Sequence, residues 1–385
     1  MIEVGLLVVA GVLMLWRPGG SAIWIGPVMC VVVGFATTLL SPSAATSALG
    51  PLRDSLLFLV FAVPLAVGLD EIGVFSSIAA RFGHDAHLVA RLWWLAAGVV
   101  AVFNLDAAVV LLTPLYVRIA RRHGLPAEAL AFQPVLLACL SSGVLPVSNL
   151  TNLIVADRWD LTAADFLTHL ALPSVAATAI GYLAYRHVFR FDTTDVGVED
   201  HVDPLALRRG VPIIGFVLVG FTLGDALGIP AWAIAAVAWS WTVSTTRRSQ
   251  WRAVPLAAVV VAASLAILVT AALPSLGLDR IFGRSGVWGD LGIVAFGTIG
   301  SAAANNLPIV LAGSSAMTNA EQAWPLLIGT NIGAIFVISA SLSGLLWSDT
   351  AARAGVHVSP RRYVAVSTRI GLPAVIVATV LVLVT

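Results

Sequence analysis

The stretch Phe103–Pro114, FNLDAAVVLLTP, places an asparagine and an aspartate in the middle of a long apolar segment that covers residues 90–121. A second apolar segment, residues 288–317, contains a comparable polar interruption, Asn305-Asn306-Leu307-Pro308. We interpret each segment as a long helix that is interrupted at its polar residues. An ionisable residue such as Asp106 is costly inside an apolar helix, so its presence there indicates a functional role.

The composition of the chain shows why these segments belong in a membrane. Of its 385 residues, 59% are hydrophobic and 11% are charged, whereas an ordinary soluble domain carries about 25% charged residues. A bilayer is crossed by a helix of about 20 apolar residues. Segments of this kind are predicted at 2–16, 22–40, 54–70, 90–121, 166–190, 210–227, 230–246, 253–273, 288–317 and 361–384.

Two further apolar stretches, residues 127–157 and 322–350, are rich in Gly, Ser, Thr, Asn and Pro. Irregular backbone is tolerated at membrane depth only where it is buried in protein or lines a cavity. We therefore predict that each stretch forms a re-entrant hairpin followed by a short helix. The resulting fold class is an all-α integral membrane protein with about 10 transmembrane helices, two re-entrant hairpins and broken helices.

The order of these features repeats along the chain. Each half has an interrupted helix, a glycine-bearing segment, a small polar run and a final helix that contains Leu-Pro, at residues 172–173 and 372–373. We predict a first membrane repeat at 1–190, a polar linker at 191–209 and a second membrane repeat at 210–385. Paired interruptions in two halves are typical of transporters with an inverted-topology repeat, whose substrate site lies between the halves.

Arginine clusters at residues 118–122 and 247–252 bear on the orientation of the chain, because cytoplasmic loops carry an excess of basic residues. On the segment count given above, an inverted repeat would place these two clusters on opposite sides of the membrane. The sequence therefore leaves the orientation open.

Asp106 is the most informative single residue. Its neighbours, residues 107–110, are all apolar, and such surroundings disfavour the charged form of a carboxyl group, so that Asp106 can take up a proton. We predict that Asp106 couples transport to protons. Alternatively, its carboxylate caps the half-helix that begins at Ala107, and the two roles are compatible.

Amide side chains flank both interruptions. Asn104, Asn305 and Asn306 each offer a carbonyl acceptor and two N–H donors without charge. Beside the exposed backbone ends of a broken helix, they can hold a neutral polyhydroxy solute, an anion or a cation. They can also simply satisfy the freed backbone groups. We predict that they bind substrate.

Two small polar runs lie further along each half. The predicted substrate-binding residues in them are Ser148, Asn149, Thr151 and Asn152 in the first run and Ser339, Ser341 and Ser343 in the second. Serine and threonine also serve plain helix–helix contact in membranes, which is the alternative. Thr330 and Asn331, between two glycines, are predicted to form a further substrate-binding nest at a helix terminus.

Several classes of function are disfavoured by what the sequence lacks. It has no P-loop motif for ATP, no metal-ligand pattern and no lysine for a Schiff base, and its net charge of +1 gives no indication of nucleic-acid binding. We therefore predict no cofactor, no metal and no nucleic-acid partner. An intramembrane enzyme is disfavoured because no histidine lies in an interruption beside a candidate nucleophile.

The motifs resemble those of the arsenical pump membrane proteins, a family of the ion transporter superfamily that also holds dicarboxylate, citrate and sodium–proton carriers. The resemblance rests on FNLDAAVVLLTP at 103–114, LPVSNLTN at 145–152, NNLPIVL at 305–311 and IGTNIGAIFVISASLSGLLW at 328–347. It differs from the family pattern at Leu105, where Asn is usual, at Asn331, where Asp is usual, and at Ile335 and Val337, where Lys and Thr are usual.

The resemblance implies a secondary carrier of the plasma (inner) membrane that exports arsenite or antimonite, as the neutral hydroxide, in exchange for protons. Such carriers work alone or with a soluble arsenite-stimulated ATPase subunit. A proton- or sodium-coupled carrier of an organic or inorganic anion is the alternative, because the site lacks charges of both signs that the family pattern has. The sequence leaves open the solute, the coupling ion and whether the carrier is a homodimer.

Overall fold

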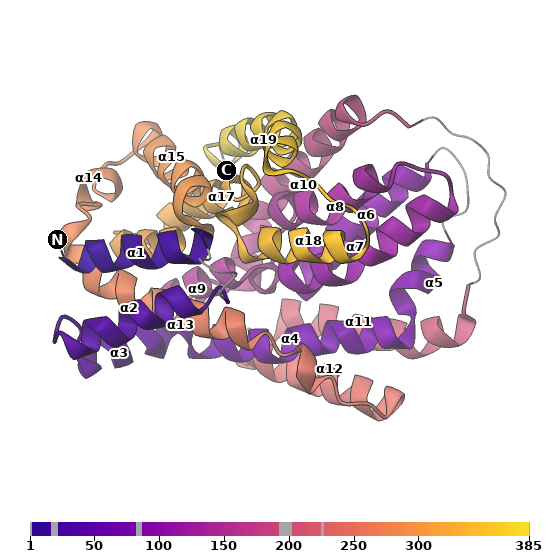
Figure 1. Cartoon of the computed structure of the whole chain (residues 1–385), viewed down its shortest axis with the longest axis horizontal. Coiled ribbons are helices and arrows are strands. Elements are labelled where there is room, and N and C mark those ends of the chain that lie inside the picture. Colours follow the sequence, from indigo (N-terminus) through magenta and orange to yellow (C-terminus); the bar gives the residue numbers. More distant parts are fainter. Residues whose placement is uncertain (1, 17–21, 82–86, 192–201, 225–226, 385) are drawn as a thin grey trace.

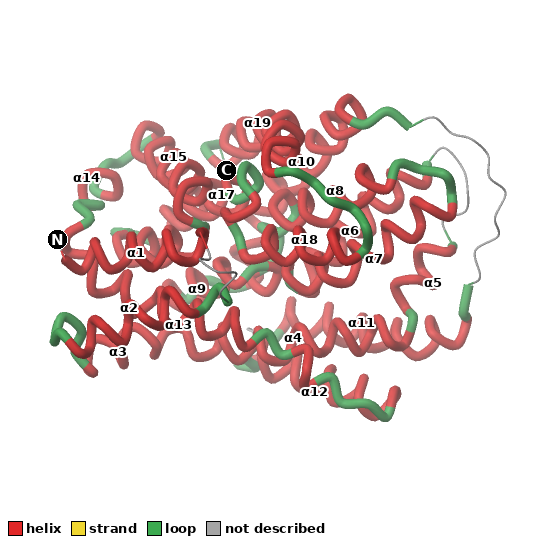
Figure 2. The backbone as a smooth tube through the Cα atoms, viewed as in Figure 1, coloured by secondary structure: helices red, strands yellow, loops and turns green. Residues whose placement is uncertain are grey.

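A computed structural model describes residues 2–16, 22–81, 87–191, 202–224 and 227–384, and Figure 2 shows that these residues form helices joined by loops, with no strand. This agrees with the all-α fold predicted from the sequence. In the first half the helices are α1 (Ile2–Trp16), α2 (Ile25–Ala36), α3 (Pro42–Leu49), α4 (Arg53–Ile72), α5 (Val74–Ala80), α6 (Leu88–Phe103), α7 (Leu105–Arg122), α8 (Ala127–Leu140), α9 (Leu150–Trp159) and α10 (Ala163–Val188).

The second half also ends in a hairpin, a broken helix and a long last helix. Its helices are α11 (Pro204–Leu223), α12 (Ala231–Thr246), α13 (Leu256–Ala272), α14 (Asp279–Phe282), α15 (Val287–Ala304), α16 (Asn306–Ala316), α17 (Ala323–Gly333), α18 (Leu342–Arg353) and α19 (Pro360–Val382). Most of the predicted linker lies outside the described residues, and its last part, from Pro204, already belongs to α11.

The two segments interpreted as interrupted helices are helical hairpins instead. The Tyr116 hydroxyl on α7 donates a hydrogen bond to the Leu92 carbonyl on α6, and these residues lie equally far from Asn104 in the sequence, so α6 and α7 run antiparallel. Likewise, Gly300 on α15 lies against Ile309 on α16. Hydropathy reports an apolar segment with a polar break but does not report whether the chain turns back at the break, which explains the difference.

The two stretches interpreted as re-entrant hairpins are, conversely, helices broken in mid-course. Between α8 and α9 the chain passes through a turn and the short 3₁₀ segment Pro146–Ser148, and between α17 and α18 it passes through Ile338–Ala340. Figure 1 shows α8 and α9, and α17 and α18, extending away from their breaks toward opposite ends of the molecule. The predicted combination of two hairpins with two broken helices is therefore present, with the two kinds of element exchanged between segments.

Contacts between helix ends define two ends of the molecule. At one end, which we call the arginine end, Arg121 on α7 donates to the Ala354 carbonyl after α18 at 2.7 Å, and Arg362 on α19 pairs with Glu128 on α8. At the opposite end, the Trp159 indole on α9 donates to the Ser314 carbonyl on α16 at 3.0 Å. The hairpin α6–α7 therefore opens at the arginine end, and the hairpin α15–α16 opens at the opposite end.

The surface of the helices suits a lipid environment. Within the described ranges, six helices are long and apolar enough to cross a membrane: α4, α10, α11, α13 with its following turn, α15 and α19. On α19, the side chains of Leu372, Ile376 and Val380 are each at least half exposed and form one stripe, as expected for a face in contact with lipid. Within the bundle, α10 packs along α19, α12 along α4, α15 along α17 and α7 along α8.

Candidate functional site

Four helix N-termini meet in the middle of the molecule. They belong to α7 and α16, the second arms of the two hairpins, and to α9 and α18, the second parts of the two broken helices. A pocket between them is lined by residues from the first turn of each helix, among them Leu105, Asn149, Leu307 and Leu342. Because helix N-termini carry unpaired N–H groups and a partial positive charge, this arrangement favours oxygen-bearing ligands.

Both hairpins turn at a single asparagine with a positive φ. Asn104 has φ 79° and ψ 139°, and Asn305 has φ 85° and ψ 144°, a backbone conformation that glycine adopts far more readily than residues with a side chain. In each tip the side-chain oxygen accepts a hydrogen bond from the backbone N–H two residues later, at 2.9 Å from Asp106 and 3.1 Å from Leu307. The asparagines that the sequence singled out therefore cap the returning helices.

The broken helices restart in a similar way. Asn149 precedes α9, and its side-chain oxygen accepts from the Thr151 N–H at 3.1 Å. Ser341 precedes α18, and its hydroxyl oxygen accepts from the Gly344 N–H at 3.0 Å. The Asn305 amide also donates to the Ser339 carbonyl at 3.0 Å, so that the tip of the second hairpin is tied to the break in the second broken helix.

The pocket is small, with a volume of about 40 Å³, far below the roughly 300 Å³ at the lower end of drug-sized ligand sites. Six of the predicted site residues line it: Asp106, Asn149, Thr151, Asn305, Asn306 and Ser341. Sequence reasoning missed the apolar part of its wall, since apolar residues in apolar helices give no signal. That part consists of Met14, Ile23, Leu105, Leu150, Ala258, Val261, Leu307 and Leu342.

Among the described residues that line this pocket, Asp106 is the only one that can carry a charge. It is 7% exposed, and its Oδ1 atom has no hydrogen-bond partner in the described part of the chain. The Nδ2 group of Asn104, in the same hairpin tip, also lacks one there. Buried polar atoms are normally paired, so the Asp106 oxygen, on the pocket wall, is available to a ligand, whereas Asn104 is fully buried outside the pocket lining. At the corresponding place in the second hairpin, two residues after Asn305, the chain has Leu307.

Asn331 connects the two halves behind the pocket. Its oxygen accepts hydrogen bonds from the Asn149 amide at 2.9 Å and from the Thr151 hydroxyl at 3.1 Å. Its own amide donates to the Asn152 oxygen at 2.8 Å. Asn331 therefore links α17 to the start of α9 by hydrogen bonds, and all of these side chains are buried.

The remaining predicted residues also lie close to the two breaks but outside the pocket lining. Asn152 donates to the Ser142 and Leu145 carbonyls at 2.6 and 3.2 Å, and the Ser148 hydroxyl donates to the same two carbonyls. Ser343 forms a hydrogen bond with Ser341 at 2.9 Å. These groups stabilise the irregular backbone at the breaks. That they contact substrate stays a prediction, and the same holds for Ser339.

Thr330 and Asn331 lie in the last turn of α17, which ends at Gly333, and the Thr330 hydroxyl donates to the Leu326 carbonyl of the same helix at 2.9 Å. The substrate-binding nest predicted at this helix terminus stays a prediction. The flanking glycines serve close packing. A Cβ atom on Gly333 would lie 2.5 Å from the Cα atom of Thr298 on α15, which shows that α15 and α17 touch through their backbones.

Two hairpins and two broken helices that converge on a small pocket with polar groups, inside a bundle with an apolar surface, define a membrane transporter. The family profile described as citrate transporter matches residues 2–340, so the chain belongs to the citrate transporter family. Similar proteins include the "Arsenical pump membrane protein" of Escherichia coli (strain K12), 25% identical with 90% of each chain covered, and that of Yersinia enterocolitica, 26% identical with the same coverage.

A solved structure supports the fold. The chain is similar to that described as "Crystal structure of the Alcanivorax borkumensis YdaH transporter reveals an unusual topology", with a TM-score of 0.62 and 13% sequence identity. The match covers 92% of this chain and 88% of that chain. Family, relatives and fold agree that the protein is a multi-pass secondary transporter.

Proposed function

We propose that the protein exports a neutral metalloid hydroxide of the arsenite type in exchange for protons. The observation that carries this proposal is the charge of the pocket, in which Asp106 is the only ionisable residue among those described and is surrounded by four helix N-termini. A trihydroxide offers both O–H donors, for a carboxylate, and oxygen acceptors, for N–H groups. Substrate and proton would then compete for the same carboxylate, which is the basis of an exchange.

The size and charge of the pocket favour this cargo over a citrate-like anion. A tricarboxylate needs compensating cations when it is removed from water, and the described residues of the pocket wall include no arginine or histidine. The pocket volume of about 40 Å³ also suits a solute of few atoms. The relatives named as arsenical pump membrane proteins support the same choice.

The test compares Asp106→Asn with the unaltered protein in proteoliposomes. Since the Asp106 Oδ1 atom has no hydrogen-bond partner among the described residues, the variant should fold normally and lose arsenite flux driven by a pH gradient by at least about 100-fold, the size of effect expected for a group that takes part directly. Asp290→Asn, the same change in the first turn of α15 outside the pocket, is the control and should keep its flux. Normal proton-driven flux in Asp106→Asn would refute the proposed role.

A proton- or sodium-coupled anion carrier is the second candidate, and one observation favours it: helix N-termini bind anions in many proteins. Uptake assays with arsenite and antimonite against citrate, a dicarboxylate and phosphate separate the two. Flux of an anion that depends on sodium and persists in Asp106→Asn would favour the second candidate.

Further parts of the proposal concern the assembly and the membrane. We place the protein in the plasma (inner) membrane and interpret the two halves, whose hairpins open at opposite ends, as an inverted-topology repeat at 1–190 and 210–385. A soluble arsenite-stimulated ATPase subunit and a homodimer are predictions. Purification from its host with quantification of co-eluting chains tests both.

A further inference from the structure

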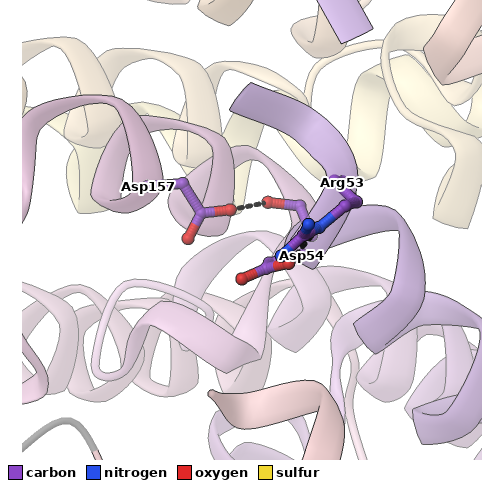
Figure 3. A network of polar contacts seen from close by, with 4 residues as sticks. Arg53, Asp54 and Asp157 are labelled. Atoms are coloured by element: carbon purple, nitrogen blue, oxygen red, sulfur yellow. Dashed lines mark hydrogen bonds and ion pairs between the residues drawn. The ribbon is translucent and has the colours of Figure 1, made fainter. Parts of the chain in front are cut away.

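A second and much larger cavity lies at the end of the molecule opposite the arginine end. Its volume is about 730 Å³. Its walls come from the start of α4, the loop between α11 and α12, and the first broken helix, from Pro146 to Thr162. The Ser55 hydroxyl on α4 donates to the Asp157 carboxylate on α9 at 2.6 Å, and Figure 3 shows this contact beside Arg53 and Asp54.

This cavity adjoins the substrate pocket. Helix α9 takes part in both, with Leu150 and Thr151 in the pocket and Leu153, Ala156 and Asp157 in the large cavity. The residues just before Asn149, at 146 and 147, also line the large cavity. The two spaces therefore lie about one turn apart along α9.

The charges of the two ends differ strongly. The two arginine clusters lie at the same end, because Arg209 and Arg248 line a surface pocket together with Glu71 at the end of α4, and the neighbouring Asp70 interacts electrostatically with Arg118 on α7. The expected placement of the two arginine clusters on opposite sides of the membrane was wrong. Residues 90–121 form a hairpin that turns back, whereas residues 127–157 form a broken helix that crosses the bundle.

Among the described residues, the arginine end carries most of the arginines. It holds Arg118, Arg121, Arg122, Arg186, Arg190, Arg208, Arg209, Arg247, Arg248, Arg252, Arg353, Arg361 and Arg362, all near helix ends that meet there. The opposite end carries Arg53, Arg158, Arg280 and Arg284. Basic residues concentrate in short cytoplasmic loops, so this asymmetry indicates how the bundle is oriented in the membrane.

We propose that the arginine end faces the cytoplasm and that the large cavity is the outer mouth of the transport path. In this conformation the path is open to the outside as far as the first break and is closed between that break and the substrate pocket. The identity of the solute that passes through the cavity rests on the proposed function. The orientation of the protein in the membrane does not depend on which solute is transported.

The wall of the cavity has a negative balance of charge, from Asp54, Asp157 and Asp160 against Arg53. A wall of one sign raises the local concentration of counter-ions and lowers that of like-charged solutes. An outer mouth of this kind attracts protons and repels anions, which matches an exchange of protons for a neutral solute.

Thiol labelling tests the orientation. The two native cysteines, Cys30 and Cys139, are buried, so the parent protein gives a low background. Ile229→Cys lies on the wall of the cavity, where Ile229 is 42% exposed, and Ser249→Cys lies at an exposed position between Arg248 and Arg252 at the arginine end. In right-side-out vesicles, an impermeant maleimide should label Ile229→Cys at once and Ser249→Cys only after permeabilisation. Labelling in the reverse order, or of both variants from outside, would overturn the orientation.

A position on the first broken helix tests whether the cavity belongs to the path. Asp157→Cys lies on the α9 wall of the cavity, where Asp157 is exposed. Impermeant reagent added outside should label it and reduce transport at least tenfold, while labelling of Ile229→Cys should reduce transport less. Full transport after complete labelling of Asp157→Cys would show that the cavity is not on the path. The readout is transport of whichever solute the unlabelled variant moves, so this outcome differs from a failure to move arsenite.

Discussion

Replacing Asn331 by alanine should both destabilise the protein and disable the substrate pocket. The substitution removes three buried side-chain hydrogen bonds, to Asn149, Thr151 and Asn152. At about 1 kcal/mol for each bond, the free energy of unfolding should fall by about 3 kcal/mol. The start of α9 loses its support from α17 at the same time, so transport should fall at least tenfold even in correctly folded protein.

Thr330→Val is the matched control for this change. Thr330 is as deeply buried as Asn331, but its hydroxyl bonds only within its own helix, to the Leu326 carbonyl. This carbonyl keeps its helical partner in the variant, so the loss should stay below about 1 kcal/mol. Unfolding in mixed detergent micelles gives the free energies, and proteoliposome flux gives the activity. An Asn331→Ala protein with the stability and flux of Thr330→Val would show that the bridge between the halves has no role.

Three further substitutions follow from the packing and the backbone. Gly333→Ala should cost about 3 kcal/mol through overpacking against Thr298, whereas Gly98→Ala, which meets nothing within 4 Å, should be neutral or slightly stabilising in the same unfolding assay. Asn305→Gly should keep the fold but lose flux, because it removes the hydrogen bonds of Asn305 with Ser339 and Leu307. Asn305→Ala should be about 1 kcal/mol less stable than Asn305→Gly, because φ is 85° at this position. Equal stabilities of the two variants would contradict this. Arg121→Met should lower stability by about 1 kcal/mol through the unpaired Ala354 carbonyl, and an unchanged midpoint of unfolding would show that water replaces the arginine.

The positions of the helices were accessible from the sequence, because hydropathy reports which residues avoid water. The predicted segment 230–246 differs by one residue at one end from α12, and 2–16 coincides with α1. The breaks at Asn104 and Asn305 were also found, since a polar side chain within an apolar membrane segment is costly and therefore rare.

The direction of the chain after each break was not accessible. A hairpin tip and a mid-helix break both appear as a polar residue among apolar ones, and the difference lies in a few backbone angles, such as the positive φ of Asn104. Tertiary contacts then decide, as between Leu92 and Tyr116. The apolar wall of the pocket, with Met14 and Val261, was likewise hidden, because nothing distinguishes it from residues that face lipid.

In the proposed exchange, Asp106 is the one carboxylate among the described residues of the pocket and sets the energetics of the cycle. Because Leu307 occupies the place that corresponds to Asp106, the proposed mechanism would move one proton for each neutral molecule. Such an exchange is electrogenic, so a membrane potential of 100 mV supplies about 2.3 kcal/mol. That sustains a concentration ratio of about 50-fold across the membrane before any pH difference is added, and a carboxylate at position 307 as well would square this ratio.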